Sequence, residues 1–287
     1  MKRIIFTSLC CLYLISSFAQ NKSENIQKQF ELGPNSANKT LVIANINGHI
    51  KVEGHASSSV QMNIQSQYED SPKDGQKMVE LHFRETADSL IAYFTVNCQS
   101  NSNGNSGPGI WKYYGMNGKH CKAFDDFQFD FAIKVPQNIN LWMATINEGD
   151  ISVKNVAGTI EVENINGSIS LQQIAGQTKA RTINGNLDIR YADNPESDSR
   201  YYSLNGDINA YYQKGLAATL SFKSFNGEFF TDVSDVSSLP SQVEKSESNK
   251  GKTTYKINEK SLFSLRNGQS PHLDFETFNG NVYLREM

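Results

Sequence analysis

The sequence repeats one short motif: an aliphatic or aromatic residue, then Asn, then Gly, then an apolar residue two positions after the Gly. The copies have their asparagines at Asn47, Asn147, Asn166, Asn184, Asn205, Asn226 and Asn279, and the Asn147 copy is longer by one residue. From 147 to 226 the steps are 19, 18, 21 and 21 residues, and 279 follows after 53. A step of this length fits one coil of a solenoid or one hairpin of a meander.

Side-chain alternation separates these two architectures. Asn-Gly favours a tight hairpin turn, but in a hairpin Ile165 would point away from the face that Val162 and Ile169 share. The same conflict recurs at Ile183, Leu204, Phe225 and Phe278. A corner that bends the chain removes the conflict. We therefore predict an all-β, single-domain β-solenoid, a β-helix-like stack of short strands with Asn-Gly corners, and keep the hairpin meander as the alternative.

The stack makes a specific prediction about the corners. Ile165, Ile183, Leu204 and Phe225 should form one buried column, with Asn166, Asn184, Asn205 and Asn226 stacked beside it. Asparagine side chains in register can hydrogen-bond along a stack, which gives a reason for Asn at each corner. In a buried column, Ile183→Asp should destabilise the fold by several kcal/mol.

The N-terminus has the pattern of a signal peptide over residues 1–19. Lys2 and Arg3 precede an apolar run from Ile4 to Ile15, and small residues stand at Ser17 and Ala19 before cleavage at Gln20. The residues before Cys10 and Cys11 do not fit a lipidated cysteine. We expect an exported, periplasmic or extracellular domain over residues 20–287, and its 38% hydrophobic content is too low for membrane spans.

The charge balance bears on the partners. Removal of residues 1–19 lowers Lys+Arg from 27 to 25 against 30 Asp+Glu, which leaves a net charge of about −5. A negative chain of this kind is not expected to bind nucleic acid or anionic membranes.

The mature chain keeps two cysteines, Cys98 and Cys121. In an oxidising compartment they should form a disulfide, which closes a loop and stabilises the fold by roughly 3 kcal/mol. The loop, residues 98–121, is rich in Gly, Ser and Asn and contains Trp111, Tyr113 and Tyr114. It is either a pinned insertion or an aromatic binding tip, because exposed Trp and Tyr bind sugars and proteins well.

Other segments are predicted to be strands, and no segment is predicted to be a helix of normal length. Residues 127–136 alternate polar and apolar until Pro136, and Val60, Met62 and Ile64 share a face. Residues 77–84 and 90–96 are predicted to pair, as are residues 253–257 and 273–284. Residues 232–252, rich in Ser, Glu and Lys, are predicted to be a mobile insertion.

These segments together resemble the bacterial putative-adhesin family of β-strand-repeat domains. The resemblance rests on the strand of residues 127–136 ending in Val-Pro, the repeated Asn-Gly corners, and steps such as Val156-Ala157-Gly158. It covers roughly residues 41–284 and is firmest over 127–229. It implies export and a one-sided β-solenoid, and it brings no catalytic residues. The chain departs from the family pattern at 98–121 and 232–252.

Motifs for catalysis or metal binding are missing from the sequence. There is no Gly-rich phosphate loop and no Cys or His pair at zinc spacing, so we expect no cofactor and no metal. Asp150, Asp188 and Asp207 recur near the corners, where arrayed carboxylates could cleave sugars or bind calcium, but repeated polar corners are usually solvated edges.

Three classes of function remain. The first is a non-enzymatic, adhesin-like binding or scaffolding protein of the bacterial envelope, whose partner is an unknown envelope protein or glycan. The second is a purely structural envelope component. The third is a carbohydrate-active β-helix enzyme, which would need carboxylates that converge in a groove.

Overall fold

The structure is a computed structural model that describes residues 21–33, 36–69, 79–96, 127–240, 243–247, 253–257 and 260–287. Within these ranges the chain forms β-strands and one three-residue 3-10 helix, Ser36–Asn38. The predicted all-β class is confirmed. The predicted signal peptide at residues 1–19 lies outside the described residues.

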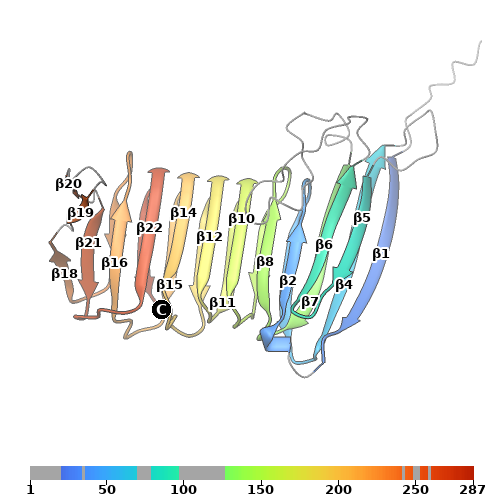
Figure 1. Cartoon of the computed structure of the whole chain (residues 1–287), viewed down its shortest axis with the longest axis horizontal. Helices are drawn as coiled ribbons and strands as arrows, with labels where there is room; N and C mark the ends of the chain where they lie inside the picture. Colours follow the sequence, from blue (N-terminus) through green and yellow to red (C-terminus); the bar gives the residue numbers. More distant parts are fainter. Residues whose placement is uncertain are drawn as a thin grey trace, which may run out of the picture.

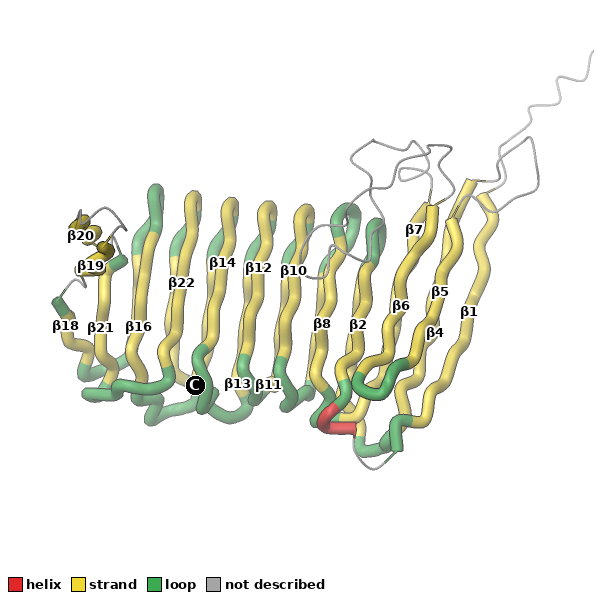
Figure 2. Tube along the Cα trace, in the orientation of Figure 1, coloured by secondary structure: helices red, strands yellow, loops and turns green. Residues whose placement is uncertain are grey.

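Two large sheets and one separate pair of short strands make up the described part of the chain (Figures 1 and 2). Sheet A contains, in spatial order, β1 (Asn21–Glu31), β4 (Ser59–Glu69), β7 (Phe127–Pro136), β3 (Ile50–His55), β9 (Ile151–Lys154), β11 (Ile169–Ile174), β13 (Leu187–Tyr191), β15 (Ile208–Tyr212), β23 (Val282–Glu286) and β17 (Phe229–Thr231). Sheet B contains β18 (Val236–Leu239), β21 (Ser261–Leu265), β16 (Ala218–Lys223), β22 (His272–Asn279), β14 (Ser199–Asn205), β12 (Thr178–Asn184), β10 (Ile160–Asn166), β8 (Asn140–Thr145), β2 (Thr40–Ala44), β6 (Ser89–Val96) and β5 (Val79–Glu85). Apolar side chains from both sheets form one core cluster.

Each Asn-Gly corner joins a strand of sheet B to a strand of sheet A. We call such a joined pair a rung. The strands of one rung do not pair with each other: β10 pairs in parallel with β8 and β12, while β11 pairs in parallel with β9 and β13. The hairpin alternative is therefore wrong for these repeats, because a hairpin would pair the two strands that its turn connects.

The last rung in the sequence is not the last in space. Strand β22 lies between β14 and β16, and β23 lies between β15 and β17. The C-terminal strands thus insert between two rungs that precede them in the sequence. The same arrangement explains the step of 53 residues between Asn226 and Asn279, because the chain passes through β18 to β21 before it returns.

The N-terminal end is closed by antiparallel strands. Strand β7 pairs in parallel with β3 and antiparallel with β4, which pairs with β1, while β5 and β6 form the predicted antiparallel pair. Residues 127–136 form a strand with the predicted bounds. Its apolar side chains are buried at alternate positions.

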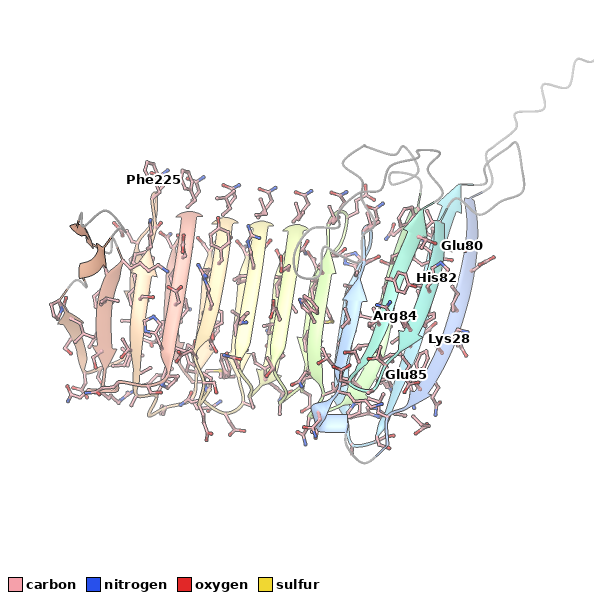
Figure 3. All side chains as sticks on the ribbon, viewed as in Figure 1. Lys28, Glu80, His82, Arg84, Glu85 and Phe225 are labelled. Atoms are coloured by element: carbon pink, nitrogen blue, oxygen red, sulfur yellow. The ribbon has the colours of Figure 1, made fainter. Side chains whose placement is uncertain are left out.

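The predicted buried column is wrong. Ile165, Ile183 and Leu204 are only partly buried on the outer face, and Phe225 is 74% exposed (Figure 3). The residue two positions before each corner Asn is polar, and it is buried in every rung except at Ser224, which is partly buried. In four rungs its side chain donates to the corner Gly carbonyl of the preceding rung: Thr145 to Gly48, Asn164 to Gly149, Thr182 to Gly167 and Ser203 to Gly185, at 2.8–3.0 Å.

The physical reason is the inward-pointing corner carbonyl, which needs a donor inside the core. A polar donor therefore takes the inward position, and strand alternation turns the next residue outward. The large destabilisation predicted for Ile183→Asp no longer follows, because the Ile183 side chain borders solvent.

The region after β17 also differs from expectation. The predicted insertion at 232–252 contains two strands: β18, which pairs with β21, and β19 (Val243–Glu247), which pairs with β20 (Thr253–Ile257). The predicted pairing of residues 253–257 with 273–284 is wrong. The second range is divided between β22 and β23 by the last Asn-Gly corner.

Candidate functional site

The corner asparagines form a continuous ladder along one edge of the stack. Each donates through Nδ2 to Oδ1 of its neighbour at 2.8–2.9 Å, in the order Asn226, Asn279, Asn205, Asn184, Asn166, Asn147. The predicted asparagine stacking is confirmed, with Asn279 between Asn205 and Asn226. Asn47 bridges to Asn147 through the backbone, and its side chain donates to the Phe127 carbonyl at 2.8 Å.

A second ladder runs through the position two residues after each corner Asn or its equivalent. At each step, the side chain at this position accepts a hydrogen bond from the backbone N–H at the same position of the next rung, at 2.7–3.2 Å. The series is Asp130, His49, Asp150, Ser168, Asn186, Asp207, Asn281 and Glu228. Two of the aspartates weighed as sugar-cleaving or calcium-binding groups, Asp150 and Asp207, are members of it, so they have a structural role.

The corner glycines stack because the rungs approach closely there. A Cβ on Gly185 would overlap the carbonyl oxygen of Gly167, and the relation repeats along the stack. Together with the two ladders, this contact fixes the spacing of the rungs and the positions of the strands that carry the outer faces.

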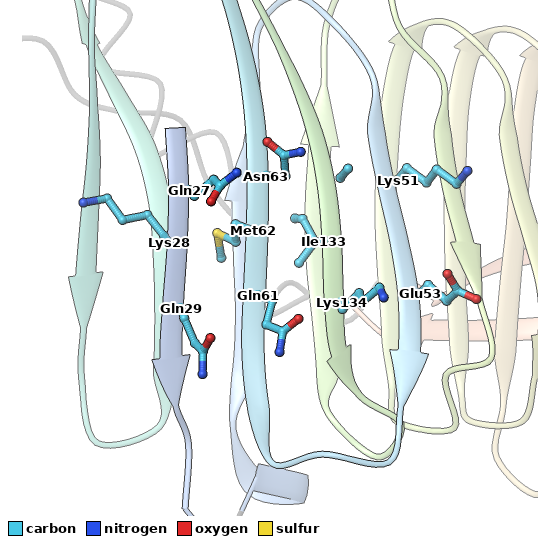
Figure 4. A pocket seen from close by; sticks show the side chains of 11 residues that line it. Gln27, Lys28, Gln29, Lys51, Glu53, Gln61, Met62, Asn63, Ile133 and Lys134 are labelled. Atoms are coloured by element: carbon cyan, nitrogen blue, oxygen red, sulfur yellow. The ribbon is translucent and has the colours of Figure 1, made fainter. Parts of the chain in front are cut away.

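A hollow on the described surface lies on the outer face of sheet A, across β1, β4, β7 and β3 (Figure 4). We call it the groove, and its volume is about 610 Å³. Its floor is Ala132, which lies between Asn63 on β4 and Lys51 on β3. Around it stand Gln27, Gln29, Gln61, Lys134 and Glu53. The small Ala132 side chain, flanked by long polar ones, creates the depression.

Charges in the groove differ from those in a second hollow of about 440 Å³ on sheet B. In the second hollow, cations and carboxylates pair, as in Lys179–Glu161 at 3.5 Å and Arg181–Glu163 at 3.8 Å. In the groove, neither Lys51 nor Lys134 lies within ion-pair distance of a carboxylate among the described residues. The groove therefore offers two cations, Lys51 and Lys134, beside a single carboxylate, Glu53, with which neither forms a close ion pair.

An aromatic strip lies on the same face nearer the other end. The rings of Phe230 and Tyr283 stack at 5.2 Å, and the Arg190 guanidinium lies 3.9 Å from the centre of the Tyr211 ring. The stack covers one face of each ring, and Phe230, on the edge strand β17, is 43% exposed.

One cluster on sheet B combines a serine, a histidine and carboxylates. Ser221 Oγ lies 3.0 Å from His272 Nε2 and donates to Asp274 at 2.5 Å. A nucleophilic serine would have to donate to the histidine instead. Burial opposes the charge on Asp274, but hydrogen bonds from Lys260 and Ser221 outweigh it and lower the pKa of the carboxyl. The arrangement suits an ion network and not a general acid, which needs a raised pKa.

Several predicted site residues cannot be placed. Cys98, Cys121, Trp111, Tyr113 and Tyr114 lie outside the described residues, so the disulfide and the aromatic binding tip stay predictions. In the described part of the chain, no group of three or more His, Cys, Asp or Glu side chains is arranged to hold a metal ion. Nor does any helix in that part have the length and apolar character needed to cross a membrane.

Sequence reasoning missed the groove. Its residues come from strands far apart in the sequence, such as Gln27 on β1 and Ala132 on β7. One local signal was present: alternate glutamine and asparagine positions in residues 25–29 and 61–65 predict a polar outer face.

No protein-family model matches the chain, and no curated protein matches it. Among solved structures, it is similar to a "putative cell adhesion protein" from Clostridium sporogenes, with 11% identity and a TM-score of 0.41 over 93% of this chain and 100% of the other. It is also similar to a "putative adhesin" from Bacteroides fragilis, with 10% identity and a TM-score of 0.39 over 92% of this chain and 97% of the other. Identities this low do not transfer a function.

Proposed function

We propose that this protein is an exported, non-enzymatic, adhesin-like binding or scaffolding protein of the bacterial cell envelope, built as a β-solenoid and binding an envelope glycan or protein. Export is supported by the signal-peptide pattern of residues 1–19. A solenoid is supported by the parallel, in-register pairing of successive rungs, such as Ile160↔Thr178 and Ile169↔Leu187.

The groove is the observation that carries the binding role. Its side chains stand on strands whose backbones pair on both sides or, in β1, along the full length of β4. Ladders at the corners hold these strands in register. Binding residues mounted on rigid strands need little reorganisation, so less conformational entropy is lost when a ligand binds.

A carbohydrate-active enzyme is the less supported alternative. Asp274 and Glu276, neighbours on one face of β22, both lie within 3.5 Å of nitrogen atoms of Arg200. Lys260 approaches both carboxylates as well, at 2.7 and 3.4 Å. Burial opposes the charge on Asp274, but its hydrogen bonds from Lys260 and Ser221 lower the pKa of this carboxyl, whereas glycoside cleavage needs a carboxyl that can donate a proton.

A glycan array and a capture experiment from envelope extract test the proposed function. Three proteins would be compared: the mature chain, a groove variant in which Gln61 and Asn63 are replaced by Ala, and a loop variant in which Trp111, Tyr113 and Tyr114 are replaced by Ala. We expect saturable binding by the mature chain and its loss in one of the two variants. Absence of any saturable ligand would favour the purely structural role. Sugar release that stops in Asp274→Asn would favour the enzyme.

A further inference from the structure

We propose that the groove binds an acidic oligosaccharide, a chain of hydroxyl-rich sugars that carry carboxylates. The inference rests on the proposed binding function and names its ligand class. It follows from three properties of the groove: the carboxamides on one side, the unpaired lysines on the other, and the absence of aromatic rings among its lining residues.

Carboxamides form the side of the groove that belongs to β1 and β4. Gln27 and Asn63 face each other across the two strands, and so do Gln29 and Gln61. Within the described chain, no hydrogen bond engages the side chains of Gln27, Gln61 or Asn63, whereas Gln29 donates to Glu31 at 2.8 Å. Each carboxamide offers a donor and an acceptor close together, which matches the donor and acceptor character of sugar hydroxyls.

Cations form the opposite side. Lys51 and Lys134 are exposed on β3 and β7, where they flank Ala132 across the strands or along the chain. A third lining lysine, Lys28, points away from the groove toward the Phe83 ring, 5.9 Å from its centre (Figure 4). Glu53 is the only carboxylate among the lining residues. Two facing cations against one carboxylate favour an anionic ligand.

The size and the lining exclude other anions. Four strands at a spacing of roughly 4.8 Å span roughly 14 Å, which is long for a single phosphate and sufficient for a short oligosaccharide. Nucleic acid is disfavoured, because no ring lines the groove to stack on bases. A neutral sugar would leave both lysines without a counter-charge.

The test is calorimetric titration of the mature protein with galacturonic acid trisaccharide, its methyl ester and maltotriose. Ala132→Gln fills the floor without a change of charge, and its control is Ser170→Gln in the same row two strands beyond Lys51. Lys134→Gln removes a groove cation, and its control is Lys154→Gln, two strands away in the same row. Circular dichroism checks that each variant is folded.

We expect binding of the acidic trisaccharide that weakens with salt and is much weaker for the ester and for maltotriose. Ala132→Gln should abolish it, and Lys134→Gln should weaken it about tenfold, the equivalent of one charged hydrogen bond. Both controls should bind like the parent. Should Ala132→Gln fail to fold, the Lys134 and Lys154 pair decides.

Three results would overturn the inference. The first is equal or stronger binding of maltotriose, and the second is undiminished binding by a folded Ala132→Gln. The third is no binding of any of the three probes. None of these results contradicts the proposed binding function, which the glycan array and the capture experiment test separately.

Discussion

The central rungs and the C-terminal rungs share the Asn and Gly of the corner but differ in order. From β8 to β15 each rung stacks on the one that precedes it in the sequence. After β15 the order breaks, because β22 and β23 from the end of the chain occupy the place next to β14 and β15, and β16 and β17 are displaced by one position. The hydrogen bonds of the Asn ladder are the same length on both sides of the break, 2.8–2.9 Å.

The Asn-Gly motif therefore specifies a corner, but it does not specify which rung stacks beside it. Every rung offers the same Asn and Gly to both sides, so the corner itself does not select which rung stacks on which. Core side chains must then select the order. At the break, Tyr201 of β14 stacks on Phe275 of β22 with ring centres 4.9 Å apart.

The largest effect is expected from deletion of residues 271–287, which form the inserted rung. The deletion removes the buried side chains of Leu273, Phe275, Val282 and Leu284. Burial of each stabilises the fold by about 1.5–3 kcal/mol, so the sum is comparable with the whole stability of a typical domain. We expect residues 218–265 to lose protection from hydrogen exchange, while residues 140–191 keep more of theirs.

The control for this deletion replaces β19 and β20 by a short linker. These strands pair only with each other among the described strands. The melting temperature should hardly change. If both deletions had the same small effect, the inserted rung would not be what holds the C-terminal strands to the stack.

Substitutions of the corner glycines test whether the rungs pack equally closely in the central stack and at the inserted rung. A Cβ on Gly185 would overlap the Gly167 carbonyl, and one on Gly280 would overlap the Gly206 carbonyl. Each Gly→Ala change should cost about 3 kcal/mol, at the upper end for overpacking, because the obstacle is backbone. Gly215→Ala is the control: its φ is +91° but nothing lies within 4 Å, so it should cost about 1 kcal/mol. Chemical denaturation measures all three, and a large loss at only one of the two stacked glycines would mean that the break loosens the stack.

The sequence predicted what depends on short-range pattern. Strand alternation located residues 127–136, and the asparagine spacing predicted the ladder. It failed where two local preferences compete: the buried donors at Thr182 and Ser203 displace the apolar Ile183 and Leu204 outward, because each corner carbonyl needs a hydrogen bond. The sequence-based prediction also failed where segments distant in the sequence meet, as they do in the groove and at the inserted rung. Nothing in the residues around Asn279 indicates which rung they will stack on.

The three tyrosines beside the break predict an alkaline weakness. The Tyr201 hydroxyl lies 2.7 Å from that of Tyr191 and 3.0 Å from that of Tyr212, and all three are buried. Burial raises the pKa of each hydroxyl. A raised folded-state pKa contributes stability that is fully present below the unfolded value of about 10 and is lost as pH rises through the folded pKa.

Tyr201→Phe tests this cluster, because it removes the shared hydroxyl and leaves a ring like that of Phe275 in the inserted rung. At neutral pH it should destabilise the fold by about 2 kcal/mol, because two buried hydroxyls lose their shared partner. Above about pH 10 the variant should lose stability less steeply with pH than the parent, since one fewer buried hydroxyl must stay protonated. Denaturation curves from pH 8 to 11 give both values, and parallel curves for the two proteins would contradict the assignment.

The smallest effect is expected in the Asn ladder, where position in the stack should matter more than sequence. Asn184 makes two ladder bonds, to Asn166 and from Asn205, whereas Asn226 at the end of the ladder makes one, to Asn279. Both side chains are exposed, so each bond is worth about 0.5–1 kcal/mol. Asn184→Ala should therefore cost about twice as much as Asn226→Ala in chemical denaturation. Asn205→Ala, which also removes two bonds but at the break, should match Asn184→Ala, because its partner there is Asn279 and not the next asparagine in the sequence. A cost for Asn205→Ala that equals the single-bond value would mean that the ladder is interrupted at the inserted rung.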